Sequence, residues 1–246
     1  MQKRGQVTLF IIIAIIIVAL VLLFILLQGG LPGQELSQSD LAKVKSYLDD
    51  CFKQKTQAGI LAIAKQGGYN KLPEGSINFL DERTAYYLKN DQLLTPSVTT
   101  VSEELNSWLN DNVQQCLLLQ GYEISSTSCK AAAKSEVDFV TASFACPVTV
   151  KKGLASSQIS SFSAKVNMQV PKMLDVSSKI IAEYRKAPDY VCIECYDKIA
   201  SDNNVTIKIV PITKEIYEPE HIWFLITDKN IKFDDKNITW RFVVES

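Results

Sequence analysis

Near its start the chain carries an unbroken apolar run, followed by a short polar stretch and then by segments of helical or strand periodicity. Residues 7–27 read VTLFIIIAIIIVALVLLFILL, in which Thr8 is the one polar residue and no residue is charged. A helix over this range is about 32 Å long, which matches the ~30 Å hydrocarbon core of a bilayer. Core helices of soluble proteins are rarely apolar on every face, and no small-residue cleavage motif follows the run. The pattern predicts a retained single-pass transmembrane helix over residues 7–27.

The charges on either side of the run predict its orientation. Lys3 and Arg4 precede it, whereas the first charged residue after it is Glu35. The positive-inside rule then keeps residues 1–6 in the cytoplasm and the rest of the chain outside, with the lipid bilayer as the partner of residues 7–27. Once Lys3 and Arg4 are subtracted from the 26 basic residues, the outer portion has 24 basic and 27 acidic residues. This balance lacks the basic patch of nucleic-acid-binding proteins, so we expect an ectodomain on the cytoplasmic membrane and no nucleic-acid partner.

A linker and a helix are predicted to open the ectodomain. Residues 28–39 are polar and contain glycine, which is typical of a flexible linker. Residues 40–65 place apolar side chains at intervals of three, four and seven, which predicts an amphipathic helix. Gly67–Gly68 suits the C-terminal cap of that helix. A short hairpin is expected around residues 84–94.

A second helix is predicted to complete the helical part of the ectodomain, residues 40–122. Thr100 and Glu103 fit the capping box that opens a helix. The apolar periodicity that follows continues to about Gln120.

The last part of the ectodomain, residues 130–246, reads mainly as strands. Its segments are rich in β-branched and apolar residues, and one of them alternates strictly between apolar and polar positions. The pattern predicts an α+β fold, in which a transmembrane helix precedes a helical pair with a small hairpin and a mostly antiparallel sheet with one or two packed helices. The predicted elements are strands at 137–150, 159–170, 205–210, 223–227 and 238–244, and a helix from Pro171 to about Lys186.

Six cysteines follow the apolar run, and an even number in an extracytoplasmic domain indicates disulfides. Two of them lie on the apolar faces of the two predicted helices, so they can meet if the helices pack. The others then pair locally, and the last two form a C-x-x-C motif, for which a structural disulfide is favoured over a zinc half-site or a redox pair because no second ligand pair and no thioredoxin-like context accompany it. The expected bridges are Cys51–Cys116, Cys129–Cys146 and Cys192–Cys195.

Few other residues suggest chemistry. Asn204 and Asn237 each begin an N-x-T acceptor pattern for glycosylation. His221, the single histidine, follows two glutamates, Glu218 and Glu220, and a histidine beside carboxylates can act as a general base. A hydrogen-bonded strand-end residue is the favoured interpretation of His221, because no G-x-S-x-G, H-E-x-x-H or P-loop motif is present. We therefore assign no catalytic residue, metal or cofactor. Neighbouring residues of a strand face opposite ways, so one ring of Tyr86–Tyr87 is expected to point outward as an aromatic contact.

Residues 3–10, Lys-Arg-Gly-Gln-Val-Thr-Leu-Phe, lead directly into the apolar run and resemble the class III signal of archaeal type IV pilins. The resemblance implies that a prepilin peptidase cuts between Gly5 and Gln6 on the cytoplasmic side and leaves the anchor intact. Pilins continue the apolar helix directly into a longer amphipathic helix, whereas Gly29–Gly33 interrupts it here. The segments 67–73, 86–97 and 146–150 are similar to membrane-anchored archaeal ectodomains to which no activity is assigned.

Together these patterns favour a structural, adhesion or interaction role at the cell surface. The anchor, the even number of cysteines and the missing catalytic motifs support this interpretation. Envelope components, other cells or identical copies in a homo-oligomer are the expected partners. Two alternatives stay open, a pilin-like filament subunit and an anchored hydrolase that acts on envelope polymers.

Overall fold

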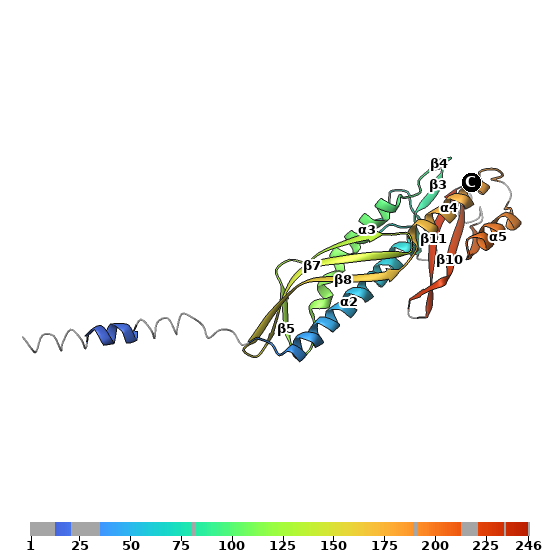
Figure 1. The fold of residues 1–246 in the computed structure, drawn as a ribbon. Coiled ribbons are helices and arrows are strands. Elements are labelled where there is room, and N and C mark those ends of the chain that lie inside the picture. Colours follow the sequence, from blue (N-terminus) through green and yellow to red (C-terminus); the bar gives the residue numbers. More distant parts are fainter. Residues whose placement is uncertain are drawn as a thin grey trace, which may run out of the picture.

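The computed structural model describes residues 13–20, 35–79, 82–188, 191–212, 221–233 and 235–245, and its fold is α+β (Figure 1). Residues 13–20 are helical and exposed. Within the described ranges, no helix has both the length and the apolar character that a bilayer crossing requires. The rest of the predicted transmembrane run, the processing positions Gly5 and Gln6, and most of the predicted linker lie outside the described residues. The prediction that the linker extends to residue 39 is wrong, because Leu36 is buried and α2 already begins at Gln38.

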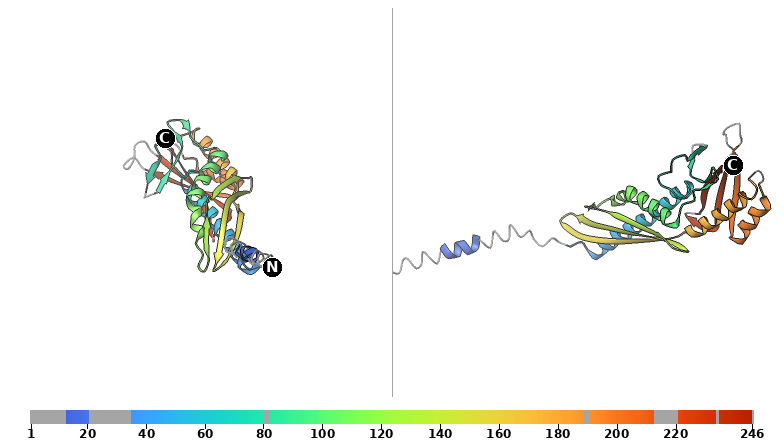
Figure 2. Two further views of the ribbon diagram at one scale, coloured as in Figure 1. Left: turned by 90° about the vertical axis from the view of Figure 1, so that its left-hand side faces the viewer. Right: turned by 90° about the horizontal axis from the view of Figure 1, so that it is seen from above.

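Helix α2 (Gln38–Lys65) runs along the elongated body of the protein (Figures 1 and 2). It begins at an N-cap, Ser37, whose side chain accepts a hydrogen bond from the Asp40 N–H at 3.1 Å. It ends where Gly67 and Gly68 take φ angles of +73° and +86°, which glycine adopts without steric cost. The prediction of a helix over 40–65 is confirmed, and its buried stripe recurs every three to four residues: Val44, Leu48, Phe52, Thr56, Gly59, Ile60, Ile63 and Ala64.

A four-stranded antiparallel sheet packs beside α2. Its long strand β7 (Phe139–Lys152) pairs with β8 (Ala155–Asn167) along one edge, and with β5 (Glu123–Ser126) and β6 (Lys130–Ser135) along the other. Alternate residues of β7 are buried, as its period predicts. The Phe52 ring of α2 stacks 4.5 Å from Phe144 of β7 and lies 4.9 Å from Phe162 of β8. The strands predicted at 137–150 and 159–170 are confirmed with small shifts, whereas β5 and β6 were not predicted.

Helix α3 (Val98–Asn112) packs against α2 and β6. The predicted capping box of Thr100 and Glu103 is wrong, because Ser97 is the N-cap and accepts the Thr100 N–H at 3.0 Å. The helix also ends before Gln120, since it tightens into the 3-10 helix η1 (Val113–Leu117). The helix therefore begins about one turn earlier than the capping box predicts, and the Ser97 side chain satisfies one of the backbone N–H groups that are free at the start of a helix.

A five-stranded sheet lies at the other end of the body (Figure 2). Its strands follow the order β4 (Gln92–Leu93), β3 (Tyr86–Lys89), β11 (Lys236–Glu245), β10 (His221–Phe233) and β9 (Val205–Ile212). Strand β3 runs parallel to β11 and the remaining pairs are antiparallel, so residues from the predicted helical part and from the last part of the chain share one sheet. Two helices accompany it, α4 (Val170–Tyr184) and α5 (Ile193–Asp202). A separate small pair joins β1 (Ile77–Phe79) to β2 (Glu82–Thr84).

The C-terminal end of α2 is fixed to this second sheet by a buried hydrogen-bond chain. The Tyr87 hydroxyl donates to the Gly67 carbonyl at 2.9 Å and accepts the Trp240 indole N–H at 2.9 Å. Tyr87 and Trp240 are fully buried. Because water cannot reach these groups, the Gly67 carbonyl and the Trp240 indole N–H both depend on the Tyr87 hydroxyl as their hydrogen-bond partner.

Replacing Tyr87 with phenylalanine is expected to lower the free energy of unfolding by about 2 kcal/mol or more, because two buried polar groups lose their partner. Urea unfolding of the full-length chain measures the change. Tyr69→Phe is the matched control, since the Tyr69 hydroxyl donates to the Leu94 carbonyl at 3.4 Å in an exposed position. Equal losses in the two variants would show that the buried chain does not secure the end of α2.

Candidate functional site

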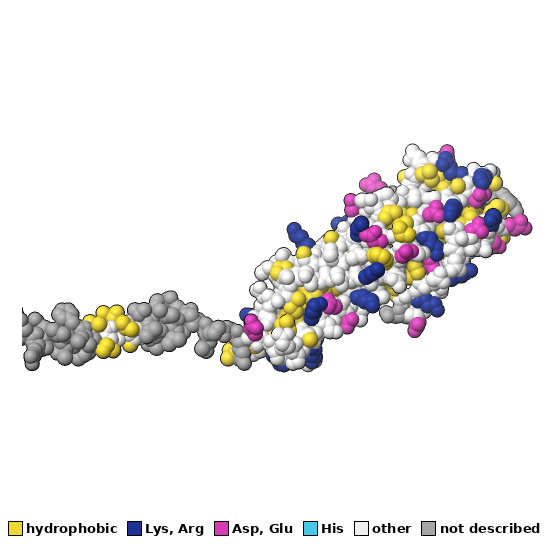
Figure 3. Space-filling view, viewed as in Figure 1, with side chains coloured by type: hydrophobic (Ala, Val, Ile, Leu, Met, Phe, Trp, Pro, Cys, Tyr) yellow, Lys and Arg dark blue, Asp and Glu magenta, His cyan; other side chains and the backbone are white. Residues whose placement is uncertain are grey.

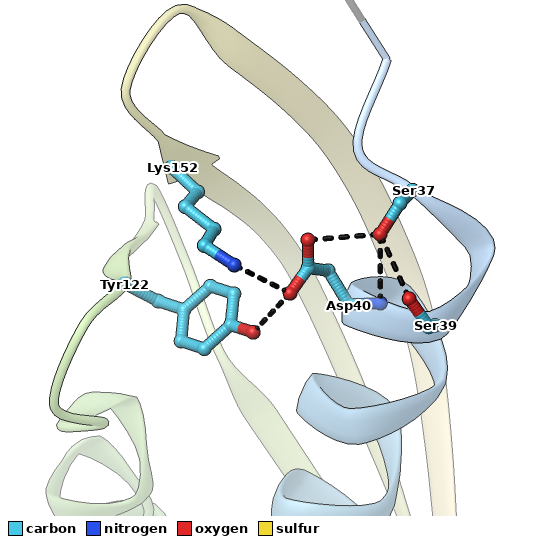
Figure 4. A network of polar contacts seen from close by, with 5 residues as sticks. All are labelled: Ser37, Ser39, Asp40, Tyr122 and Lys152. Atoms are coloured by element: carbon cyan, nitrogen blue, oxygen red, sulfur yellow. Dashed lines mark hydrogen bonds and ion pairs between the residues drawn. The ribbon is translucent and has the colours of Figure 1, made fainter.

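The start of α2 carries a network of polar side chains at the end of the body where the chain enters from residue 35 (Figure 4). Asp40, in the first turn of α2, accepts hydrogen bonds from Lys152 of β7 at 2.8 Å and from the Tyr122 hydroxyl at 2.5 Å, both on Oδ1. Its other oxygen accepts the Ser37 hydroxyl at 2.8 Å. The Lys152 ammonium also lies 5.3 Å from the centre of the Tyr122 ring. One carboxylate thus joins three segments that are far apart in the sequence, and we call these four residues the entry cluster.

The ionisable side chains of the entry cluster shift one another's pKa values. The hydrogen bond from Lys152, followed by those from Tyr122 and Ser37, holds the pKa of the Asp40 carboxyl well below its usual range. The same contacts with Asp40 raise the pKa of Tyr122 and of Lys152. Because both oxygens of Asp40 are bonded within the chain, the carboxylate is suited to holding elements together rather than to accepting a substrate proton.

A second contact fixes the segment that leads into α2. The backbone N–H of Leu36 donates to the Ser157 hydroxyl of β8 at 3.2 Å, and Leu36 is itself buried. The segment before α2 is therefore attached to the first sheet as well as to the helix that follows it.

Asp40→Asn is expected to destabilise the protein at pH 7, and the difference from the wild type is expected to shrink as the pH falls below about 4. The sign follows because a carboxyl with a lowered native pKa contributes stability above its unfolded pKa and loses it as the pH falls toward the native value. Asp49→Asn is the control, since Asp49 forms a partly exposed i,i+4 ion pair with Lys45 within α2, and such pairs contribute little. Chemical unfolding from pH 7 to pH 3 measures how far each variant's free energy of unfolding lies below that of the wild type. If the loss of unfolding free energy in Asp40→Asn stayed constant over this range, the stabilising role of the ionised Asp40 carboxylate would be contradicted.

The structure contains the three disulfides that the cysteine pattern predicts. Cys51–Cys116 joins α2 to η1, and Cys129–Cys146 joins the start of β6 to β7. Cys192–Cys195 lies within the first turn of α5. The helical phase of Cys51 and Cys116 made the first bridge possible if the helices pack, and the packing of α2 against η1 brings the two sulfur atoms together.

His221 is buried at the start of β10, with 5% of its surface exposed. Its Nδ1 lies 3.4 Å from the Tyr86 hydroxyl, and Glu245 is its register partner on β11. Burial lowers the pKa of His221, with Glu245 acting in the opposite direction and Lys89 in the same one. Glu218 and Glu220 lie outside the described residues. His221 is thus a buried residue at the start of a strand, with the Tyr86 hydroxyl beside its ring.

The prediction that one ring of Tyr86–Tyr87 points outward is wrong, because both rings are buried. Tyr86 is 6% exposed and packs with Ile77 of β1 and with Trp223. Tyr87 faces the other way and stacks 4.7 Å from Phe242. Tyr86 and Tyr87 do face opposite ways, as a strand requires, but the β1–β2 pair covers the face that was expected to be exposed to solvent.

Both glycosylation patterns lie on exposed turns or strand ends of the second sheet. Asn204 is exposed between α5 and β9 with a φ of +51°, and Asn237 is exposed as the second residue of β11. Their threonines, Thr206 and Thr239, are both register neighbours of Thr227 on β10. The two acceptor patterns therefore lie near one end of the same sheet, where a glycosyltransferase could reach the asparagines.

No protein-family model matches this chain, and searches of curated proteins and of solved structures returned no significant match.

A polar groove of about 450 Å³ lies between α2 and β8. In its lining, Lys45, Asp49 and Lys53 of α2 face Ser161 and Ser163 of β8. Figure 3 shows positive and negative side chains interspersed over the face in view. Such a mixed lining suits a polar surface of another protein better than a polyanion.

A smaller cavity of about 330 Å³ lies between β4 and α4, at the end of the body away from the entry cluster. Leu93 and Thr95 line one side of it, and Ile181 and Arg185 line the other. Leu93 is 59% exposed. Sequence reasoning missed this surface because α4 and β4 are far apart in the chain. Among the described residues, no group of three or more His, Cys, Asp or Glu is placed to hold a metal ion.

Proposed function

We propose that this chain is a single-pass membrane-anchored protein whose ectodomain serves a structural, adhesion or interaction role at the outer face of the cytoplasmic membrane. The observation that supports it best is the entry cluster. It ties the first helix of the ectodomain to β7 and to the segment before β5, at the C-terminal end of the predicted linker. In a tethered protein, any pull reaches the folded part at this point, so reinforcement is most useful there.

The shape of the body is consistent with the same role. Helix α2 has 28 residues and is about 42 Å long at 1.5 Å per residue. The second sheet, the cavity beside Leu93 and both glycosylation patterns lie toward the end of α2 that is opposite the entry cluster. A partner protein or envelope component would meet this end first if residues 7–27 hold the other end at the bilayer. The three disulfides fit an oxidising extracytoplasmic location.

The anchor is tested with the full-length chain in its native membrane. Alkaline carbonate is expected to leave the protein in the membrane pellet, and protease added to intact cells is expected to digest the ectodomain. Ile16→Arg/Ile17→Arg is expected to release the protein, because each charge in the middle of a transmembrane helix costs about 3 kcal/mol. The matched control Ile16→Leu/Ile17→Leu should behave as the wild type does.

Two outcomes of that experiment would reject the anchored ectodomain. One is release of the wild-type chain by carbonate. The other is protection from protease in intact cells with all six cysteine thiols open to titration.

A filament subunit is the second candidate, and the observation that favours it is α2 itself. The N-terminal signal resembles that of pilins, in which a long amphipathic helix follows the apolar one, and α2 is such a helix beyond the linker. Cell-surface filaments that contain this chain and disappear in a Gly5→Leu variant would favour the filament subunit. An anchored chain that forms no filaments, whether or not Gly5 is replaced, would favour the first proposal.

A further inference from the structure

The three disulfides differ in how they relate to the hydrophobic core. Cys116 and Cys146 are fully buried, and their partners Cys51 and Cys129 pack against the same core. Cys192 and Cys195 are only half-buried and do not belong to that core. Between them, Ile193 is 63% exposed. Both cysteines of the third bridge are partly exposed, whereas each of the other two bridges has one fully buried cysteine, so the third bridge is the most accessible to a dissolved or protein-borne thiol.

The third bridge also constrains the fold least. It spans a sequence separation of 3, compared with 65 and 17 for the others, and the stabilisation from a crosslink grows with the loop that it closes. Helix α5 has contacts that do not depend on the bridge. Tyr196 is buried with its ring 5.4 Å from Phe224, and Lys179 of α4 bonds to Asn203 at 3.1 Å. The protein can therefore keep its fold when this bridge opens.

The two sulfur atoms are not equivalent. Cys192 is the N-cap of α5, and its Sγ accepts the backbone N–H of Cys195 at 3.3 Å. A hydrogen bond to sulfur and the positive end of a helix both stabilise a thiolate. Glu194 acts against this, but it is exposed and its charge is screened by solvent. Cys192 is thus the better leaving group of the pair.

We propose that Cys192–Cys195 is a thiol–disulfide exchange site whose substrate is a pair of thiols on another protein. A partner thiolate attacks Sγ of Cys195, the bond between the two cysteines breaks, and Cys192 leaves as the thiolate that the Cys195 N–H stabilises. The second partner thiolate then attacks the partner sulfur of this mixed disulfide and expels Cys195. The partner loses two electrons and gains a disulfide, while Cys192 and Cys195 gain two electrons and take up two protons as thiols. This site goes beyond the proposed role and does not depend on the anchor.

The first test compares the three bridges in the purified full-length protein. The protein is equilibrated in dithiothreitol buffers of graded reduced-to-oxidised ratio, the free thiols are alkylated, and peptide mass spectrometry gives the reduced fraction of each pair. Cys192–Cys195 is expected to open at a ratio at least tenfold lower than the other two bridges require, with an unchanged circular dichroism spectrum. Opening in step with the other bridges, or only together with loss of structure, would overturn the proposal.

The second test uses the difference between the two sulfur atoms. A synthetic peptide with two cysteines serves as the substrate for the wild type and for the variants Cys192→Ser and Cys195→Ser. The wild type is expected to convert the peptide to its disulfide, and neither variant should do so. In the variants, alkylation with iodoacetamide at pH 7 should be at least fivefold faster at the remaining Cys192 than at the remaining Cys195. Equal alkylation rates, or no oxidation of the peptide by the wild type, would refute the exchange site.

Discussion

One helix serves both sheets of this protein, and the rest of the architecture depends on that sharing. The middle of α2 packs on the first sheet, where the Phe52 ring lies 4.5 Å from the Phe144 ring and 4.9 Å from the Phe162 ring. Its C-terminal end is held against the second sheet by the Tyr87 hydroxyl. Separating the sheets would expose a stripe of buried side chains along α2 and leave buried polar groups unpaired, and both changes cost free energy. The two sheets are therefore expected to behave as one cooperative unit.

The same helix links the fold to the proposed role. Its first turn carries Asp40, which binds Lys152 and Tyr122 at the end of the body where the chain enters. Its middle is joined to η1 by Cys51–Cys116. Surface ion pairs such as Lys45–Asp49 contribute little on their own, whereas Asp40 gathers several hydrogen bonds from separate segments. A tethered ectodomain would use such a helix to carry load from the bilayer side toward surfaces that meet a partner.

The sequence predicted the elements whose burial is one-sided and regular. Helix α2 and strands β7 and β8 have a buried face and a wet face, so their period is visible in the residues. Helix α5 escaped prediction because it buries only Tyr196 in 10 residues. Strand β6 escaped because it is made of alanine, serine and lysine, which have little preference for strands.

The candidate sites were harder to predict than the elements. The cysteine pairs followed from helical phase and closeness in sequence, and the structure confirms them. The entry cluster could not be found, because Tyr122 and Lys152 lie 82 and 112 residues from Asp40 and no local pattern links them. The outward ring expected at Tyr86–Tyr87 failed for a different reason: the nearby strand β1, whose Ile77 packs with Tyr86, was not predicted from its turn-rich surroundings.

Hydrogen exchange of the full-length protein, followed by mass spectrometry at rising urea, tests the coupling through α2 most directly. Peptides from β7 and β8 and peptides from β10 and β11 are expected to lose protection at the same urea concentration, together with peptides from α2. If the amides of β10 and β11 exchanged freely while β7, β8 and α2 stayed protected, the sheets would be independent, and α2 would not be the element that unites them.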